Sequence, residues 1–113
     1  TVECYPSTLY PAIINLVDNA VFWLRSRVTG RAILFDVYSN GIIVANNGPA
    51  IDERDYERIF ERGFSRKPGG RGLGLFISSR ALKAESMNLT VVDPPDGFSA
   101  AFSISMPTLK TNP

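Results

Sequence analysis

Two asparagines that lie four residues apart, Asn15 and Asn19, are the first residues of this chain whose type and spacing could do chemistry. Around them, residues 7–28 carry apolar side chains at the helical period, which predicts one long helix. The two amides then stack one turn apart, opposite the apolar stripe. A solvated face would explain a single asparagine, but Phe22 and Trp23 lie beside this pair, which favours a pocket lined by amides and aromatic rings. The stripe predicted to face the core is Leu9, Ile13, Leu16, Val17, Ala20, Leu24 and Val28.

A second candidate for chemistry is the glycine-rich stretch 69–75 (GGRGLGL), which opens a helix predicted to run to about Glu85. The first amides of a helix lack partners and carry partial positive charge, so such a turn can bind an anion. A solvated basic loop is the alternative. No Walker motif and no dinucleotide-binding fingerprint is present, so a phosphate site here belongs to another class. Four residues of the same loop could also contact the anion, namely Ser65, Arg66, Lys67 and Arg71.

Composition limits the other possibilities. The chain has 113 residues, of which 44% are hydrophobic, so we expect a single domain over residues 1–113. Twelve basic and eleven acidic residues nearly cancel, which argues against nucleic acid and anionic membranes as partners. There is no histidine and only one cysteine, so histidine-based nucleophilic catalysis and Cys/His metal clusters are excluded. A lone cysteine and the lack of a long apolar run favour a cytoplasmic location.

The remaining elements are predicted from period-two patterns and turn residues. Strands are predicted over 31–39 and 42–45, around the hairpin signal Asn40-Gly41, and over 88–92 and 98–106, around a turn at 93–97. A short helix capped by Asp52 is predicted through Phe60. Residues 1–5 resemble part of a strand, so we expect the chain to be a piece of a longer protein. Hairpins separated by helices predict an α+β two-layer sandwich.

Residues near each end of the long helix predict where it begins and where it ends. Pro11 is compatible with the helix only if it lies in the first turn, where Ser7 or Thr8 could cap the exposed amides. At the other end, Gly30 can adopt the left-handed conformation that closes a helix.

Four stretches, in this order, resemble the motif boxes of the Bergerat-fold ATPases. This superfamily groups histidine protein kinases with DNA gyrase, the mismatch-repair ATPases and the large heat-shock chaperone. Together the boxes span most of the chain, and their joint occurrence is far more specific than any one of them. The fold implied is a mixed, mostly antiparallel sheet covered by helices on one face. The matching stretches are 15–20 (NLVDNA, asparagine box), 46–51 (NNGPAI, first glycine box), 59–64 (IFERGF, phenylalanine box) and 70–75 (GRGLGL, second glycine box).

Within the superfamily, the histidine-kinase branch is the most similar. Hydrolytic members have a water-activating glutamate where this chain has Asn15, and an amide cannot accept a proton near neutral pH. The resemblance implies that Asn19 and Asn15 are the catalytic residues and the ligands of Mg²⁺, and that ATP lies between the long helix and the loop from Phe64 to Gly72. The nucleotide-binding residues implied are Asn15, Asn19, Trp23, Asn46, Gly48, Ile51, Phe64, Lys67, Gly70, Arg71, Gly72, Leu73, Gly74 and Leu75.

This chain departs from the family pattern at three positions. Phe22 stands where a lysine or arginine is common, so one phosphate contact is lost or is supplied by the basic loop. Ala50 replaces a glycine, which stiffens the loop slightly. Asn46 replaces the aspartate that accepts a hydrogen bond from the adenine amino group. An asparagine can turn its oxygen or its nitrogen toward the base, which predicts a narrower preference for ATP over GTP, unless water or a backbone group holds it in the accepting orientation.

The function expected from this resemblance is that of a histidine-kinase catalytic domain. Such a domain binds Mg²⁺ and ATP and transfers the γ-phosphate to a histidine outside this chain. Its partners would be a histidine-bearing dimerisation domain and a response regulator, with no nucleic acid and no direct membrane contact. The alternatives are a stand-alone Bergerat-fold ATPase, a non-catalytic nucleotide-dependent switch or interaction module, and a serine kinase of the anti-sigma type.

Overall fold

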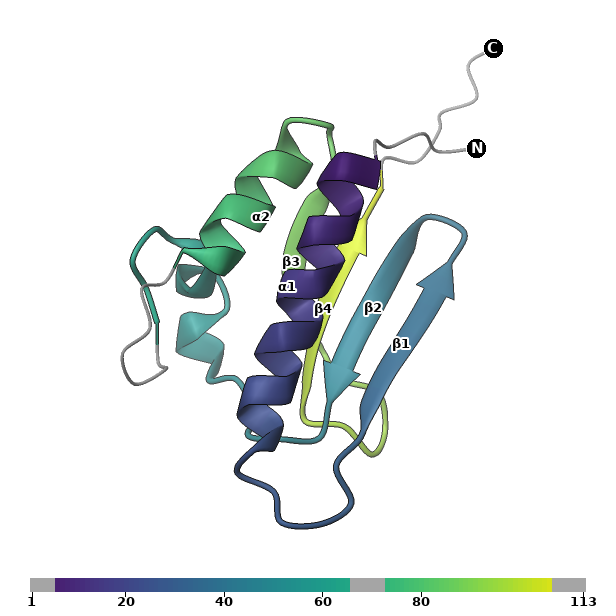
Figure 1. Cartoon of the computed structure of the whole chain (residues 1–113), viewed down its shortest axis with the longest axis vertical. Coiled ribbons are helices and arrows are strands. Elements are labelled where there is room, and N and C mark those ends of the chain that lie inside the picture. Colours follow the sequence, from purple (N-terminus) through teal and green to yellow (C-terminus); the bar gives the residue numbers. More distant parts are fainter. Residues whose placement is uncertain (1–5, 66–72, 107–113) are drawn as a thin grey trace.

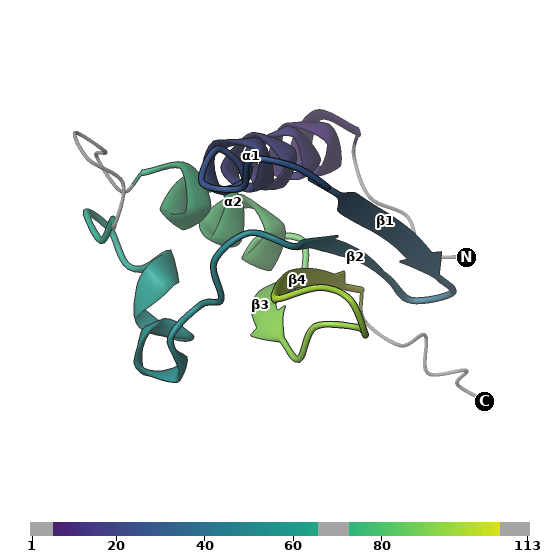
Figure 2. The same cartoon turned by 90° about the horizontal axis from the view of Figure 1, so that it is seen from below.

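The computed structural model describes residues 6–65 and 73–106 and shows two layers. Two helices lie on the same face of a four-stranded sheet, and the edge-on view separates the two layers (Figures 1 and 2). No described helix is long and apolar enough to cross a membrane. The elements are α1 (Pro6–Leu24), β1 (Ile33–Tyr38), β2 (Gly41–Asn46), α2 (Gly74–Lys83), β3 (Asn88–Val92) and β4 (Ala100–Ser105), with 3₁₀ turns at Glu53–Asp55 and Arg58–Phe60 between β2 and α2.

The sheet has the strand order β1-β2-β4-β3, and each neighbouring pair is antiparallel. Val44 of β2 lies opposite Phe35 on one side and Phe102 on the other. The predicted α+β two-layer sandwich with helices on one face is therefore confirmed. The central strands β2 and β4 bring the end of β2, at Asn46, next to the start of β4, at Ala100.

The core lies between the helices and the three strands β2, β4 and β3. Its members come from every layer, so burying them fixes α1 and α2 against the sheet. The edge strand β1 lies outside this core, and Phe35 and Val37 on it are 46% and 65% exposed. The buried cluster is Ala12, Leu16, Ile42, Val44, Leu82, Met87, Leu89, Phe102 and Ile104.

Helix α1 is shorter than predicted. It ends at Leu24, the last buried residue of its stripe, whereas Val28 is 91% exposed and was wrongly expected to face the core. Gly30 does adopt a left-handed φ of 68°, but in the loop beyond the helix, so it does not close α1. Pro11 lies inside the helix and not in its first turn, and it has no N–H to donate to the carbonyl of Ser7.

The hairpin turn is displaced by one residue from the prediction. Tyr38 pairs with Gly41, so the two-residue loop is Ser39-Asn40, and Gly41 is already the first residue of β2. A Cβ at Gly41 would lie 2.8 Å from the carbonyl oxygen of Ile104. The glycine is therefore required by the close approach of β4 and not by the turn.

The other elements agree with the predictions in kind and differ at their ends. The helix predicted from Asp52 to Phe60 is divided into the two 3₁₀ turns, and Asp52 caps the first by accepting from the Arg54 N–H at 2.9 Å. Helix α2 ends before Ser86, whose φ is 63°, and the Met87 N–H reaches the Leu82 carbonyl at 2.9 Å, a closing pattern that needs no glycine.

Candidate functional site

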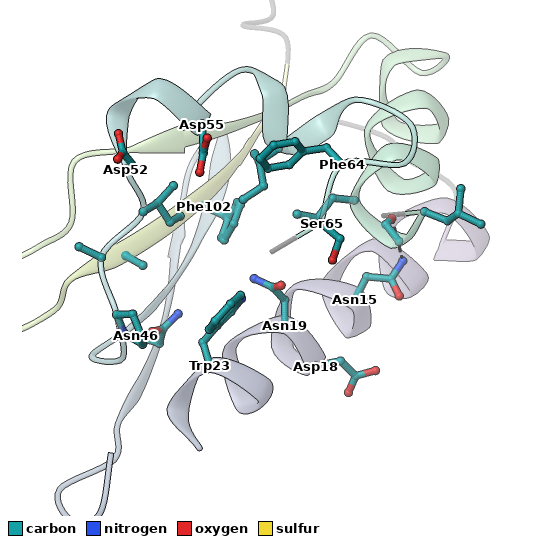
Figure 3. Close-up of a pocket in the computed structure, with 18 residues that line it drawn as sticks. Asn15, Asp18, Asn19, Trp23, Asn46, Asp52, Asp55, Phe64, Ser65 and Phe102 are labelled. Carbon is teal, nitrogen blue, oxygen red and sulfur yellow. Dashed lines mark hydrogen bonds between the residues drawn. The ribbon is translucent and has the colours of Figure 1, made fainter. Parts of the chain in front are cut away.

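One side of α1 forms the wall of a cavity. Asn15, Asn19 and Trp23 follow at intervals of four residues, and all three line the cavity (Figure 3). Asn15 donates from Nδ2 to Ser78 Oγ of α2 at 2.7 Å, which ties the two helices together. This bond fixes the asparagine amide and leaves its carbonyl oxygen available to a ligand.

Asn19 is the more unusual of the two asparagines. Its side chain is only 6% exposed, and no group within residues 6–65 and 73–106 makes a hydrogen bond to it. Its polar atoms instead reach the open space of the cavity (Figure 3). Because these atoms are accessible from the cavity and make no hydrogen bond to the described residues, this side chain is suited to a polar or ionic ligand there.

A third asparagine closes the far end of the cavity. Asn46 is the last residue of β2 and is 2% exposed. Its Oδ1 accepts a hydrogen bond from the Gly48 N–H at 2.9 Å, and its backbone oxygen accepts from the Ser99 N–H at 3.0 Å. A Cβ at Gly48 would lie 3.0 Å from both Asn46 Oδ1 and the Trp23 carbonyl oxygen, so a side chain at this position would require these neighbours to shift.

The space between these asparagines has the size and character of a small-molecule site. The cavity volume is about 560 Å³, within the range that holds cofactors and nucleotides. Much of its wall is apolar, and the polar groups come from α1, the end of β2 and the segment between β2 and α2 that carries Asp52, Asp55 and Ser65. The apolar side chains that line it include Trp23, Ile51, Ile59, Phe64, Leu73, Leu75 and Phe102.

Helix α2 begins at the opposite end of the cavity from Asn46. Leu73 at its N-cap makes no side-chain capping bond, and Leu73, Gly74 and Leu75 all line the cavity. The partial positive charge of a helix N-terminus favours an anion there. The cavity thus offers an apolar end beside Asn46 and an anion-binding end beside Gly74.

Comparison with known proteins decides the family. The family model described as "Histidine kinase-, DNA gyrase B-, and HSP90-like ATPase" matches residues 4–110. The chain belongs to this family. Its relatives include sensor histidine kinases, and solved histidine-kinase structures share its fold, so it is a histidine-kinase-type ATPase domain.

Two Escherichia coli (strain K12) proteins are among the relatives. The signal transduction histidine-protein kinase AtoS is 29% identical over 101 residues, covering 88% of this chain and 16% of AtoS. The sensor protein QseC is 38% identical over 88 residues, covering 74% of this chain and 19% of QseC. The ATPase domain thus spans less than a fifth of these relatives.

Two solved structures share the fold. The mycobacterial sensor histidine kinase MprB superposes with a TM-score of 0.76 at 26% identity, covering 94% of this chain and 74% of that chain. The catalytic domain of the histidine kinase ThkA gives a TM-score of 0.66 at 31% identity, covering 92% and 70%.

The predicted site residues of the ATPase domain largely gather at the cavity. Gly48 is not on the cavity wall, but it holds Asn46 in place. Lys67, Gly70, Arg71 and Gly72 lie outside the described residues. The predicted residues that line the cavity are Asn15, Asn19, Trp23, Asn46, Ile51, Phe64, Leu73, Gly74 and Leu75.

Phe22 does not line the cavity, although the sequence placed it beside the pocket with Trp23. Its ring instead packs edge-on against Trp23 at 5.0 Å between centroids, and the Arg25 guanidinium lies 5.1 Å from the Phe22 centroid. Phe22 therefore supports the ring that forms the wall.

Several lining residues were missed by the sequence analysis. Pro49, Ala50 and Ile59 lie within the motif boxes, so their positions in the sequence were a signal for the site. Ala100 and Phe102 of β4 carry no motif and reach the cavity only because β4 pairs with β2. Ser65, predicted as a possible anion contact in the basic loop, does line the cavity. The lining residues not predicted are Asp18, Pro49, Ala50, Asp52, Asp55, Ile59, Ala100 and Phe102.

Carboxylates at the cavity are the main electrostatic feature that was not predicted as part of the site. Asp55 is only 5% exposed and points toward the cavity in Figure 3. Asp52 pairs with Arg54 at 2.8 Å, and this hydrogen bond and charge raise the pKa of the Arg54 guanidinium. From the sequence, Asp52 had been assigned only to the cap of a short helix, where carboxylates are also favoured.

Proposed function

We propose that this chain binds Mg·ATP in the cavity and presents the γ-phosphate to a histidine outside the chain, as the catalytic domain of a two-component sensor kinase. One observation carries the proposal. The buried amide of Asn19 has no hydrogen-bond partner among the described residues and faces a nucleotide-sized cavity with an apolar end and a helix N-terminus. In the whole protein, a dimerisation domain bearing the histidine and a response regulator would be the partners, in the cytoplasm.

The donor set fits magnesium. Mg²⁺ takes oxygen ligands, and it is usually held by one or two protein groups together with substrate phosphates and waters. Asn19 Oδ1 and Asn15 Oδ1, one turn apart on α1, are the protein oxygens that would hold it. When bound, the ion would neutralise charge on the phosphate oxygens. Asn19 and Asn15 would orient the phosphates relative to the N-terminus of α2.

The residue at position 15 favours transfer over hydrolysis. A hydrolytic site needs a group that takes a proton from water, and a neutral amide does not act as a base near pH 7. Asn15 also donates to Ser78 Oγ, so its nitrogen is committed to the contact between α1 and α2. This argues against the alternative of a stand-alone ATPase.

A non-catalytic nucleotide switch is the second candidate, and Phe22 favours it. Because this side chain packs on Trp23 and not in the cavity, position 22 supplies no cation to a phosphate. A domain that binds nucleotide without transferring phosphate would satisfy the same geometry.

The magnesium assignment is tested by Asn19→Ala. Loss of an oxygen ligand should remove the magnesium-dependent part of ATP binding, a loss of at least about tenfold by comparison with changes at other metal sites. Calorimetry with and without Mg²⁺ measures it, and Asn88→Ala, at an exposed position of β3, is the matched control. Equal affinity in the variant and the parent would refute the assignment.

Transfer is tested separately from binding. The chain is mixed with a dimerisation domain that bears the acceptor histidine and with γ-labelled ATP, and acid-labile label on the acceptor is measured. The kinase proposal predicts label that depends on Mg²⁺. Tight Mg·ATP binding with no label on any histidine acceptor would favour the switch.

A further inference from the structure

The different chemistry of the two ends of the cavity indicates where the base of a bound nucleotide would lie. Asn15 and Trp23 are separated by two turns of α1, about 12 Å at the rise of an α-helix. Gly74 lies beside Asn15, which is within 3.5 Å of its carbonyl, whereas Trp23 lies toward Asn46 (Figure 3). The phosphates of a nucleotide are favoured at the helix N-terminus and a flat heterocycle at the apolar end. The base would therefore meet Trp23, Phe102 and Asn46.

The orientation of the Asn46 amide is determined by its neighbour. A backbone N–H can only donate, so the side-chain atom 2.9 Å from the Gly48 nitrogen must be the carbonyl oxygen of Asn46. The NH₂ group then lies on the other side of the amide, and Figure 3 shows the nitrogen directed toward the cavity. A backbone group does fix this amide, as one sequence-based alternative expected, but its bond to the oxygen turns the nitrogen, and not the oxygen, toward the cavity.

The nitrogen so directed needs an acceptor. Asn46 is 2% exposed, and among the described residues none accepts a hydrogen bond from its Nδ2. The side-chain atoms of Asn46 border the open space of the cavity, so a ligand there can supply an acceptor for this nitrogen. The wall at the base end therefore presents a donor, whereas an aspartate at this position would present only acceptors.

We infer that Asn46 makes the base end selective for an acceptor, so that 6-oxopurine nucleotides bind this domain at least as tightly as ATP. Guanine and hypoxanthine carry a carbonyl oxygen at C6, where adenine carries an amino group. The C6 carbonyl oxygen can accept a hydrogen bond from the Asn46 NH₂. The adenine amino group is itself a donor, so it cannot accept one. A ring nitrogen of adenine can still accept a hydrogen bond from the amide. ATP should therefore still bind, but the preference for ATP over 6-oxopurine nucleotides should be lost. The inference rests on the proposed function.

The test is a competition for a ribose-labelled fluorescent nucleotide in the presence of Mg²⁺. ATP, inosine triphosphate and the triphosphate of unsubstituted purine riboside differ at the six-position edge of the base, and GTP adds the natural 6-oxopurine. For the parent chain, the dissociation constant of inosine triphosphate should be equal to or below that of ATP, and unsubstituted purine should bind less tightly than inosine triphosphate.

The matched variant is Asn46→Asp. An acceptor-only side chain should shift the ratio of the two dissociation constants toward ATP by about tenfold, the effect of one base-reading contact. Asn40→Asp introduces the same charge at the exposed hairpin turn and should leave the ratio unchanged. Thermal unfolding checks that both variants are folded, and the ligand series on the parent chain does not depend on either variant.

The outcomes separate this inference from the proposed function. ATP binding at least tenfold more tightly than inosine triphosphate to the parent chain would overturn the inference and leave nucleotide binding intact. An unchanged ratio in Asn46→Asp would also overturn it. If no purine nucleotide displaces the probe, the proposed function fails and the inference fails with it.

Discussion

The two ends of the cavity are built in different ways. The end beside Asn46 is made of the same residues that hold the fold together, because Phe102 is both a core residue and a cavity wall, and Asn46 ends a central strand. The end beside Gly74 is made where two helices meet, through the bond from Asn15 to Ser78. Under the proposed function, recognition of the base would thus be coupled to stability more strongly than recognition of the phosphates.

The largest effect should come from Phe102→Ala at the base end. Phe102 is 2% exposed and packs edge-on against Phe60 at 6.2 Å, so truncation leaves a cavity and should cost about 3–5 kcal/mol of unfolding free energy. Urea denaturation measures this cost. Phe35→Ala removes the same ring from a half-exposed site on the edge strand and should cost far less. Similar losses of unfolding free energy in the two variants would show that the base end of the cavity is not part of the stabilising core.

Trp23→Ala should separate binding from stability better than any change at Phe102. Trp23 is only partly buried, but its ring lines the cavity, and loss of an aromatic partner for a base costs about 1–3 kcal/mol of binding free energy. Calorimetry with Mg·ATP measures the loss. Phe22→Ala is the control, because Phe22 packs against the Trp23 ring and is not among the described residues that line the cavity, and its effect should be smaller. Equal losses would show that the base does not lie against Trp23.

The sequence allowed the local parts of this site to be predicted. Asn15, Asn19 and Trp23 share one helix, so their spacing alone places them on one wall. The same helix was predicted to extend too far along the chain, because Val28 continues the helical spacing of apolar residues. The spacing of apolar residues does not reveal whether another element packs against a given position, and the Val28 side chain is 91% exposed.

The nonlocal parts could not be predicted in the same way. Ala100 and Phe102 reach the cavity because β4 pairs with β2, and the identity of a strand's neighbour is not encoded in its own alternation. The orientation of Asn46 depends on a bond to Gly48 that only coordinates reveal. The motif boxes predicted that Asn46 would face the ligand, but not which of its atoms would do so.

The smallest effect should come from the bond between the two helices. Ser78 is 3% exposed, and Ser78→Ala removes the acceptor of the Asn15 amide, which should cost about 1 kcal/mol of unfolding free energy. A double-mutant cycle with Asn15→Ala isolates the pair and should give a coupling of about 0.5–1.5 kcal/mol. Ser79→Ala, at the next position of α2, should show no coupling to Asn15. Because Ser78 is remote from Asn46, its variant should also leave the ratio of ATP to inosine triphosphate affinity unchanged. A shift in that ratio would mean that the two ends of the cavity are coupled, and the contrast between them would not hold.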